Sequence, residues 1–149
     1  MFISQKCQYA IRAIFELSRR YGNGPVRIAD IAEAQAIPVR FLEVILNQLK
    51  QAGFVFSQRG SRGGYLLSRP PVELTVGDII RFIEGPLGPV ICAMGSSKSD
   101  CRLYGDCVFL PMWERVRSAV SGVYDQTTFQ SLVEMDARRS EEYVASYAI

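Results

Sequence analysis

Three cysteines lie in one polar stretch of the chain, and their type and spacing could support metal chemistry. Cys92, Cys101 and Cys107 are separated by eight and then five residues, whereas the fourth cysteine of the chain, Cys7, lies near its start. Cysteine thiolates are soft, anionic ligands that suit iron and zinc, and a loop lets several of them converge without straining a helix. Metal binding, redox chemistry and unreactive thiols are the possibilities that this stretch leaves open.

The expected compartment and the size of the chain narrow these possibilities. The N-terminal segment has no charged region followed by an uninterrupted apolar run, and no uncharged apolar stretch reaches about 18 residues. We therefore expect a cytoplasmic protein with no membrane partner, in which four cysteines are poor candidates for disulfides. The 149 residues, of which 48% are hydrophobic, are enough for one globular domain with an added oligomerising element.

Positive charge is concentrated in the first half of the chain. Residues 1–70 contain ten Lys and Arg against four Asp and Glu, a net charge of +6, whereas residues 71–149 contain seven against eleven, a net charge of −4. A basic half indicates either a surface that binds nucleic acid or a moderately basic domain with no such partner.

Hydrophobic periodicity predicts three helices in this basic half. Apolar residues at three- and four-residue spacing predict a helix from about Ser4 to Tyr21, and a shorter helix follows within residues 26–35. Pro38 suits the first position of a third helix, which extends to about Ala52. Its outer face carries the polar residues Arg40, Glu43, Asn47 and Lys50. This face either presents base-reading groups or is an ordinary solvated surface.

A change to strand-like spacing follows the third helix. Residues 54–57 and 65–68 predict two short strands, and the Gly-rich segment 59–64 between them predicts a turn that carries Arg59 and Arg62. Three helices followed by an arginine-tipped hairpin are typical of a winged helix-turn-helix, in which the third helix enters the major groove of DNA and the wing contacts the backbone or minor groove.

The second half adds a connecting helix, the cysteine loop and a long helix that begins at Leu110. Trp113, Val116, Val120 and Val123 step by three, four and three residues along this helix, as in a coiled-coil seam. Such a seam would pair with the same helix of a second copy, or else be buried within one chain.

The predicted fold is mainly α with a small β-hairpin wing, and a long C-terminal dimerisation helix follows the winged helix-turn-helix. The predicted regions are 1–70 for DNA binding, 71–90 for the connecting helix, 91–109 for the cysteine loop, 110–135 for the dimerisation helix and a short helix, and 136–149 for a loosely ordered tail.

Several segments resemble the Rrf2 family of bacterial winged-helix regulators across roughly residues 1–130. They include "ISQKCQYAIRAIFELS", "RGSRGGYLLSRPP" and "LTVGDIIRFIEGP". The resemblance implies a homodimeric regulator that binds a palindromic DNA operator and is not an enzyme. It also implies that Glu43 reads bases, with cytosine N4 as a suitable donor, and that Arg59 enters the minor groove. At Pro38, Arg40 and Phe41 the chain departs from the Ser, Ser and Tyr usual in the IscR-like branch, so we expect a different operator.

The same resemblance assigns the three loop cysteines as ligands of an iron–sulfur cluster, of the 2Fe-2S or 4Fe-4S type, as in the IscR/NsrR-like branch. The histidine ligand of that branch is replaced by Leu110, and the chain contains no histidine. A fourth ligand would therefore be Cys7, an oxygen donor such as Asp106 or Glu114, or an exogenous group. For Cys7 the alternative is a small apolar residue on the inner face of the first helix.

Two other functions are compatible with the cysteine loop. The CymR-like branch lacks the cluster, so the chain could be a cluster-free regulator controlled by thiol oxidation, by zinc or by a partner enzyme of cysteine metabolism. Coordination by four cysteines is also typical of structural zinc. A thiol redox or electron-transfer protein is the weakest alternative, because it has no CxxC motif here and leaves the third helix and the wing without a purpose.

Overall fold

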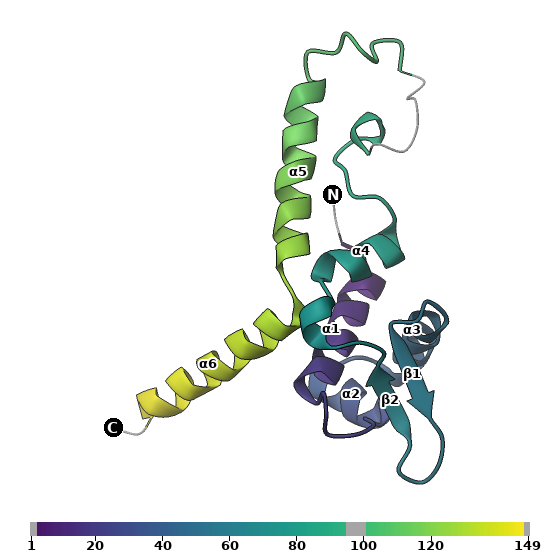
Figure 1. Ribbon diagram of the computed structural model, residues 1–149, viewed down its shortest axis with the longest axis vertical. Coiled ribbons are helices and arrows are strands. Elements are labelled where there is room, and N and C mark those ends of the chain that lie inside the picture. Colours follow the sequence, from purple (N-terminus) through teal and green to yellow (C-terminus); the bar gives the residue numbers. More distant parts are fainter. Residues whose placement is uncertain (1–2, 95–100, 148–149) are drawn as a thin grey trace.

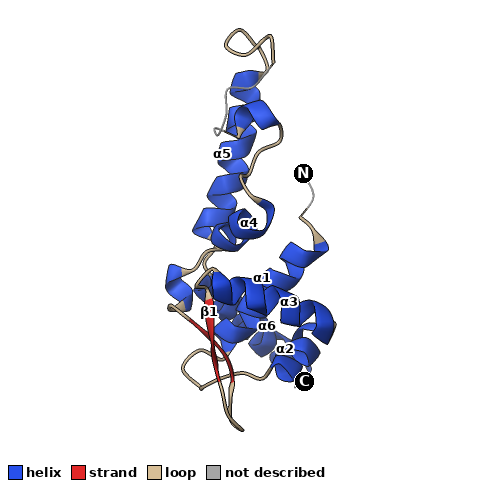
Figure 2. Cartoon of the chain, turned by 90° about the vertical axis from the view of Figure 1, so that its right-hand side faces the viewer, coloured by secondary structure: helices blue, strands red, loops and turns tan. Residues whose placement is uncertain are grey.

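The computed structural model describes residues 3–94 and 101–147. Within these residues the chain forms six α-helices, one two-stranded hairpin and two short 3-10 helices (Figures 1 and 2). In chain order they are α1 (Gln5–Arg19), α2 (Ile28–Gln35), α3 (Val39–Gln51), β1 (Val55–Gln58), β2 (Gly64–Leu67), η1 (Pro71–Glu73), α4 (Val76–Glu84), η2 (Ile91–Ala93), α5 (Leu110–Gln126) and α6 (Phe129–Tyr147). The predicted mainly helical fold with a hairpin wing is confirmed.

The first three helices enclose the core of the domain. Ser4 caps α1 by accepting a hydrogen bond from the Cys7 amide, and the apolar stripes of α1 and α3 pack against α2. The turn from α2 to α3 passes through Ala36, whose φ of 50° is left-handed. The largest fully buried aliphatic side chains of these helices are Ile14, Ile31, Leu42, Ile45, Leu46 and Leu49. Burying the inner stripe of α3 leaves its opposite face outward.

The wing is a short antiparallel hairpin that is anchored to the segment before α2. Val55 pairs with Leu67 and Gln58 with Gly64 across the two strands. Val26 and Tyr65 also exchange two backbone hydrogen bonds, of 3.0 and 2.8 Å. A Cβ atom at Gly64 would lie 2.4 Å from the Val26 carbonyl oxygen, so this close approach requires glycine.

The second half of the chain is built on α4. Thr75 and Asp78 form a capping box at the start of α4, and α5 leads from the cysteine loop back to the side of α4 (Figure 1). In both views this loop and the wing lie at opposite ends of the molecule. The chain then turns at Thr127, whose carbonyl accepts a 2.9 Å hydrogen bond from the Val76 amide, and Phe129 is completely buried at the start of α6.

The predicted loose tail is wrong for residues 136–147, because α6 continues to Tyr147; residues 148–149 lie outside the described ranges. Contacts distant in sequence support this helix. Leu132 packs against the core, and Asp136 Oδ2 lies 3.5 Å from Arg19 Nε on α1. Within the described ranges, none of the helices combines the length and the apolar character that crossing a bilayer requires.

Candidate functional site

The outer face of α3 is exposed as the sequence predicts. The side chains of Arg40, Glu43, Asn47 and Lys50 all lie in the solvent, opposite the buried stripe of the helix. Lys50 Nζ donates a 3.4 Å hydrogen bond to Ser57 Oγ on β1, so the C-terminal end of α3 contacts the wing. The helix and the wing therefore form one continuous surface.

The wing tip adds further positive charge to this surface. Arg59 and Arg62 are both exposed at the tip. Arg27, which caps the start of α2, donates a 3.2 Å hydrogen bond from its guanidinium to the Ser61 carbonyl of the tip. Sequence reasoning missed Arg27, because its role depends on a contact 34 residues away. The three arginines place cations at the wing tip, which suits binding to a phosphate backbone.

A buried carboxylate fixes the packing of α1 against α2. Glu16 is only 1% exposed, and its oxygens accept hydrogen bonds from Arg20 Nε at 2.7 Å and from Gln35 Nε2 at 2.9 Å. Arg19 lies 3.4 Å from the same carboxylate. Sequence reasoning also missed Glu16, although a carboxylate beside Leu17 on the apolar stripe, with arginines three and four residues later, was a usable signal.

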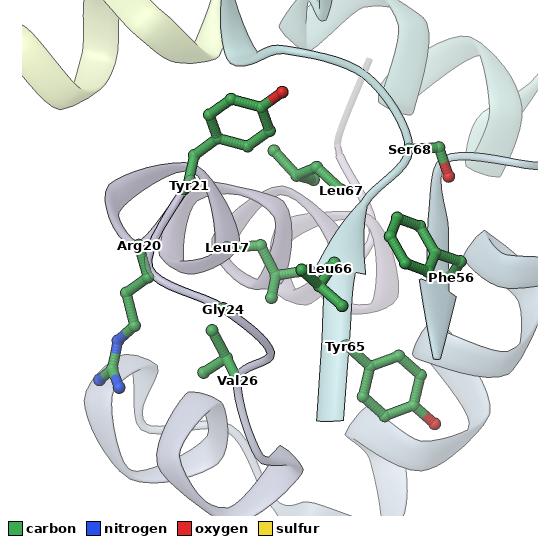
Figure 3. Close-up of a pocket in the computed structure, with 11 residues that line it drawn as sticks. Leu17, Arg20, Tyr21, Gly24, Val26, Phe56, Tyr65, Leu66, Leu67 and Ser68 are labelled. Carbon is green, nitrogen blue, oxygen red and sulfur yellow. The ribbon is translucent and has the colours of Figure 1, made fainter. Parts of the chain in front are cut away.

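A hollow of about 430 Å³ separates the end of α1 from the base of the wing (Figure 3). Leu17, Val26 and Leu66 line it with aliphatic carbons, and the Arg20 guanidinium points away from them. No polar groups converge there in the view of Figure 3. Beside this hollow, the backbone bridge from Val26 to Tyr65 links the wing to the segment before α2, and Leu67 of β2 is buried in the core.

The loop cysteines differ in exposure to solvent. Cys92 in η2 and Cys107 before α5 are half-buried, and Cys101 is exposed. No three His, Cys, Asp or Glu side chains gather into a possible metal site in the part of the chain that the structure describes; residues 95–100 of this loop lie outside it. Three thiols fit an iron–sulfur cluster or zinc by donor chemistry, and binding either would require the loop to bring them together.

Cys7 lies in the core between α1 and α4 instead of in the loop. Its side chain has no exposed surface. Burial, together with the negative charge of Glu84 and a hydrogen bond to that carboxylate, raises the pKa of the Cys7 thiol to about 12. Since a metal ligand has to be a thiolate, this environment favours the packing role over the ligand role. Asp106 and Glu114, the predicted oxygen donors, are exposed at the end of the loop and in the first turns of α5.

The predicted seam of α5 divides between two adjacent faces. Trp113 and Val120 are half-buried, and α5 packs against α4 and η2. Val116 and Val123 are 40% and 63% exposed. They continue a stripe of other exposed residues at spacings of three and four, namely Phe109, Met112 and Ala119. Two residues of the predicted seam, Trp113 and Val120, are therefore partly covered within the chain, and the other two, Val116 and Val123, are exposed to solvent.

An exposed basic helix beside an arginine-tipped wing, carried on a winged helix-turn-helix, defines a DNA-binding protein. Residues 3–135 match the family model Rrf2, described as an iron-dependent transcriptional regulator, and the chain belongs to the Rrf2 family. The members of this family are transcriptional regulators, not enzymes.

Named relatives and solved structures agree with this assignment. The chain is 35% identical to the HTH-type transcriptional regulator CymR of Bacillus subtilis, over 97% of this chain and 98% of the relative. It is 31% identical to the regulator IscR of Serratia proteamaculans, over 89% and 79%. The structure of CymR, titled the global cysteine regulator of B. subtilis, superimposes with a TM-score of 0.74 at 34% identity, over 91% of this chain and 98% of that one. The structure of T. potens IscR superimposes with a TM-score of 0.74 at 35% identity, over 94% and 90%.

Proposed function

We propose that the protein acts as a homodimer that reads a palindromic operator with two copies of α3 and the wing. The observation that carries this proposal is the open stripe of α5, which runs from Phe109 to Val123. Isolated apolar residues on a surface are ordinary, but five at alternating three- and four-residue spacing match the seam of paired helices. A two-fold axis along this stripe would present two reading surfaces to half-sites one helical turn, or a multiple of one, apart.

Within each half-site the side chains have separate roles. Glu43 accepts a hydrogen bond from a cytosine N4 group in the major groove, and Arg40 and Asn47 lie on the same exposed face. Lys50 and Arg62 bind phosphates, which sets the register of the protein on the duplex. Arg59 enters the minor groove from the wing tip, where a narrow groove attracts arginine.

We further propose that Cys92, Cys101 and Cys107 hold an iron–sulfur cluster. When bound, such a cluster supplies a centre sensitive to iron supply, oxidants or nitric oxide. The thiol positions connect the loop to the dimerisation helix, because η2 contacts α5 and Cys107 lies three residues before Leu110. A change in the state of these thiols would therefore act on the helix that sets the separation of the two reading surfaces. For this to work as a switch, the free-energy difference between the two arrangements of the dimer must depend on the state of the thiols. Otherwise operator affinity would not change.

A cluster-free regulator, controlled by thiol oxidation, zinc or a partner enzyme of cysteine metabolism, is the second candidate. Cys101 is exposed whereas Cys92 and Cys107 are half-buried, so the three thiols differ in their access to an oxidant. The 35% identity to B. subtilis CymR, a protein described as a global cysteine regulator, points the same way.

Anaerobic purification separates the two candidates. The absorption spectrum and the iron, sulfide and zinc contents would be measured for the wild type and for Cys92→Ala, Cys101→Ala, Cys107→Ala and Cys7→Ala. We expect iron and sulfide in the wild type, their loss in the three loop variants, and their retention in Cys7→Ala. Colourless protein with stoichiometric zinc, or with no metal, would support the second candidate.

A further inference from the structure

The outer face of α3 is not polar throughout. Val44 is 57% exposed and lies between Arg40, four residues before it, and Asn47, three residues after it. Residues three and four apart are neighbours on a helix, so Val44 lies beside Arg40 and Asn47, at the edge of the face that carries the reading groups and on the side toward Phe41. Phe41 is 61% exposed and extends the apolar surface from Val44 toward α1.

These residues line a hollow that is mostly apolar. Phe41, Val44 and Ile45 line a space of about 500 Å³ together with two basic residues, Lys6 of α1 and Arg40. The ring of Tyr9 meets that of Phe41 edge to face, with centroids 6.4 Å apart and planes at 60°, and this contact holds the Phe41 ring in place. The two basic residues favour a polyanion, and the apolar lining favours a polyanion that presents an apolar group.

Among the base edges in the major groove of DNA, only thymine presents an apolar group, the C5 methyl. We propose that Val44, supported by Phe41, contacts a thymine methyl in each half-site and so determines part of the operator sequence. The inference rests on the proposed function, in which α3 enters the major groove. A valine suits this contact because its stiff side chain loses little conformational freedom on binding.

Replacing thymine by deoxyuridine tests the contact, because it removes only the methyl group and leaves base pairing unchanged. The operator would first be selected from random DNA with the full-length protein, and each thymine of a half-site would then be replaced in turn. At one position per half-site we expect about fourfold weaker binding, and about fifteenfold when both half-sites are changed.

The Val44→Ala variant should bind the thymine and the deoxyuridine operators equally at that position. Val72→Ala is the matched control, because Val72 is 60% exposed in η1, away from α3, and its removal should leave the methyl dependence intact.

Four results would overturn the inference. If wild type binds a selected operator but no deoxyuridine position weakens binding, or if Val44→Ala keeps the methyl dependence, the methyl contact is absent while the proposed function stands. If Val44→Ala alters the sedimentation of the protein instead, the hollow is a protein contact. Failure to select any DNA sequence would refute the proposed function itself, and the inference with it.

Discussion

Gly64 lies where β2 meets the segment before α2, and replacing it by alanine tests how this edge of the wing is held. The new Cβ would lie 2.4 Å from the Val26 carbonyl oxygen and 2.6 Å from its carbon, and both are backbone atoms. Carbon atoms do not approach this closely, so the strand and the segment before α2 must separate by more than about half an ångström. This separation disrupts the two hydrogen bonds between Val26 and Tyr65, at 3.0 and 2.8 Å.

The expected loss is about 2 kcal/mol in the free energy of unfolding, at about 1 kcal/mol for each hydrogen bond. Urea denaturation monitored by circular dichroism measures this loss of stability. The displaced wing also withdraws Arg59, so operator affinity should fall by about 5- to 30-fold, as measured by fluorescence anisotropy at fixed salt.

Gly122→Ala is the matched control for this prediction. Gly122 lies in α5 with no atom within 4 Å of an added Cβ, so the same substitution should stabilise the helix by about 0.5–1 kcal/mol. The two variants therefore differ in the sign of the expected effect. If Gly64→Ala unfolds within about 0.5 kcal/mol of wild type and the Tyr65 amide stays protected from hydrogen exchange, the wing is not held by this bridge.

Three further predictions concern the dimer, the wing tip and the buried thiol. Val116→Glu with Val123→Glu should yield a folded monomer in sedimentation experiments and reduce operator affinity at least about 100-fold, since each half-site is then bound alone; an unchanged dimer would place the interface elsewhere. Arg59→Ala should weaken binding by about 5- to 30-fold and relax sequence preference, whereas an equal loss on all sequences would make Arg59 a phosphate contact only. Because the pKa of Cys7 is raised from 9.0 to about 12, its contribution to stability is complete below pH 9 and is lost as pH rises toward 12. Urea denaturation at pH 8 and pH 10.5 should show this decline, and Cys7→Ala should reduce it; an equal decline in that variant would assign it to other groups.

The local elements follow from patterns that residues near one another in sequence create. Examples are the apolar stripe of α3, the proline before it and the glycines of the wing turn. Each of these signals influences the conformation of only a few neighbouring residues, so the sequence predicts the order of helices and strands correctly. The same patterns predict that Arg40, Glu43, Asn47 and Lys50 are exposed, because an amphipathic helix can bury only one of its faces.

The tail and the seam of α5 show where local patterns fail. The segment after Asp136 has weak periodicity, yet it is helical, because α6 begins at the buried ring of Phe129 and packs against α1. The spacing of Trp113, Val116, Val120 and Val123 is the same whether the partner is α4 or a second chain. Only the position of α4 assigns Trp113 and Val120 to contacts within the chain.

The sequence by itself determined the elements, the basic reading face and the set of thiols available to a metal. The tertiary structure decided which of these groups meet. It buried Cys7 beside Glu84, held the wing tip with Arg27, joined α1 to α2 through Glu16 and left Cys101 exposed while it half-buried the other two loop thiols. The physical reason is that propensity and periodicity act between neighbours along the chain. Burial, pKa and hydrogen bonding depend on atoms that only folding brings close.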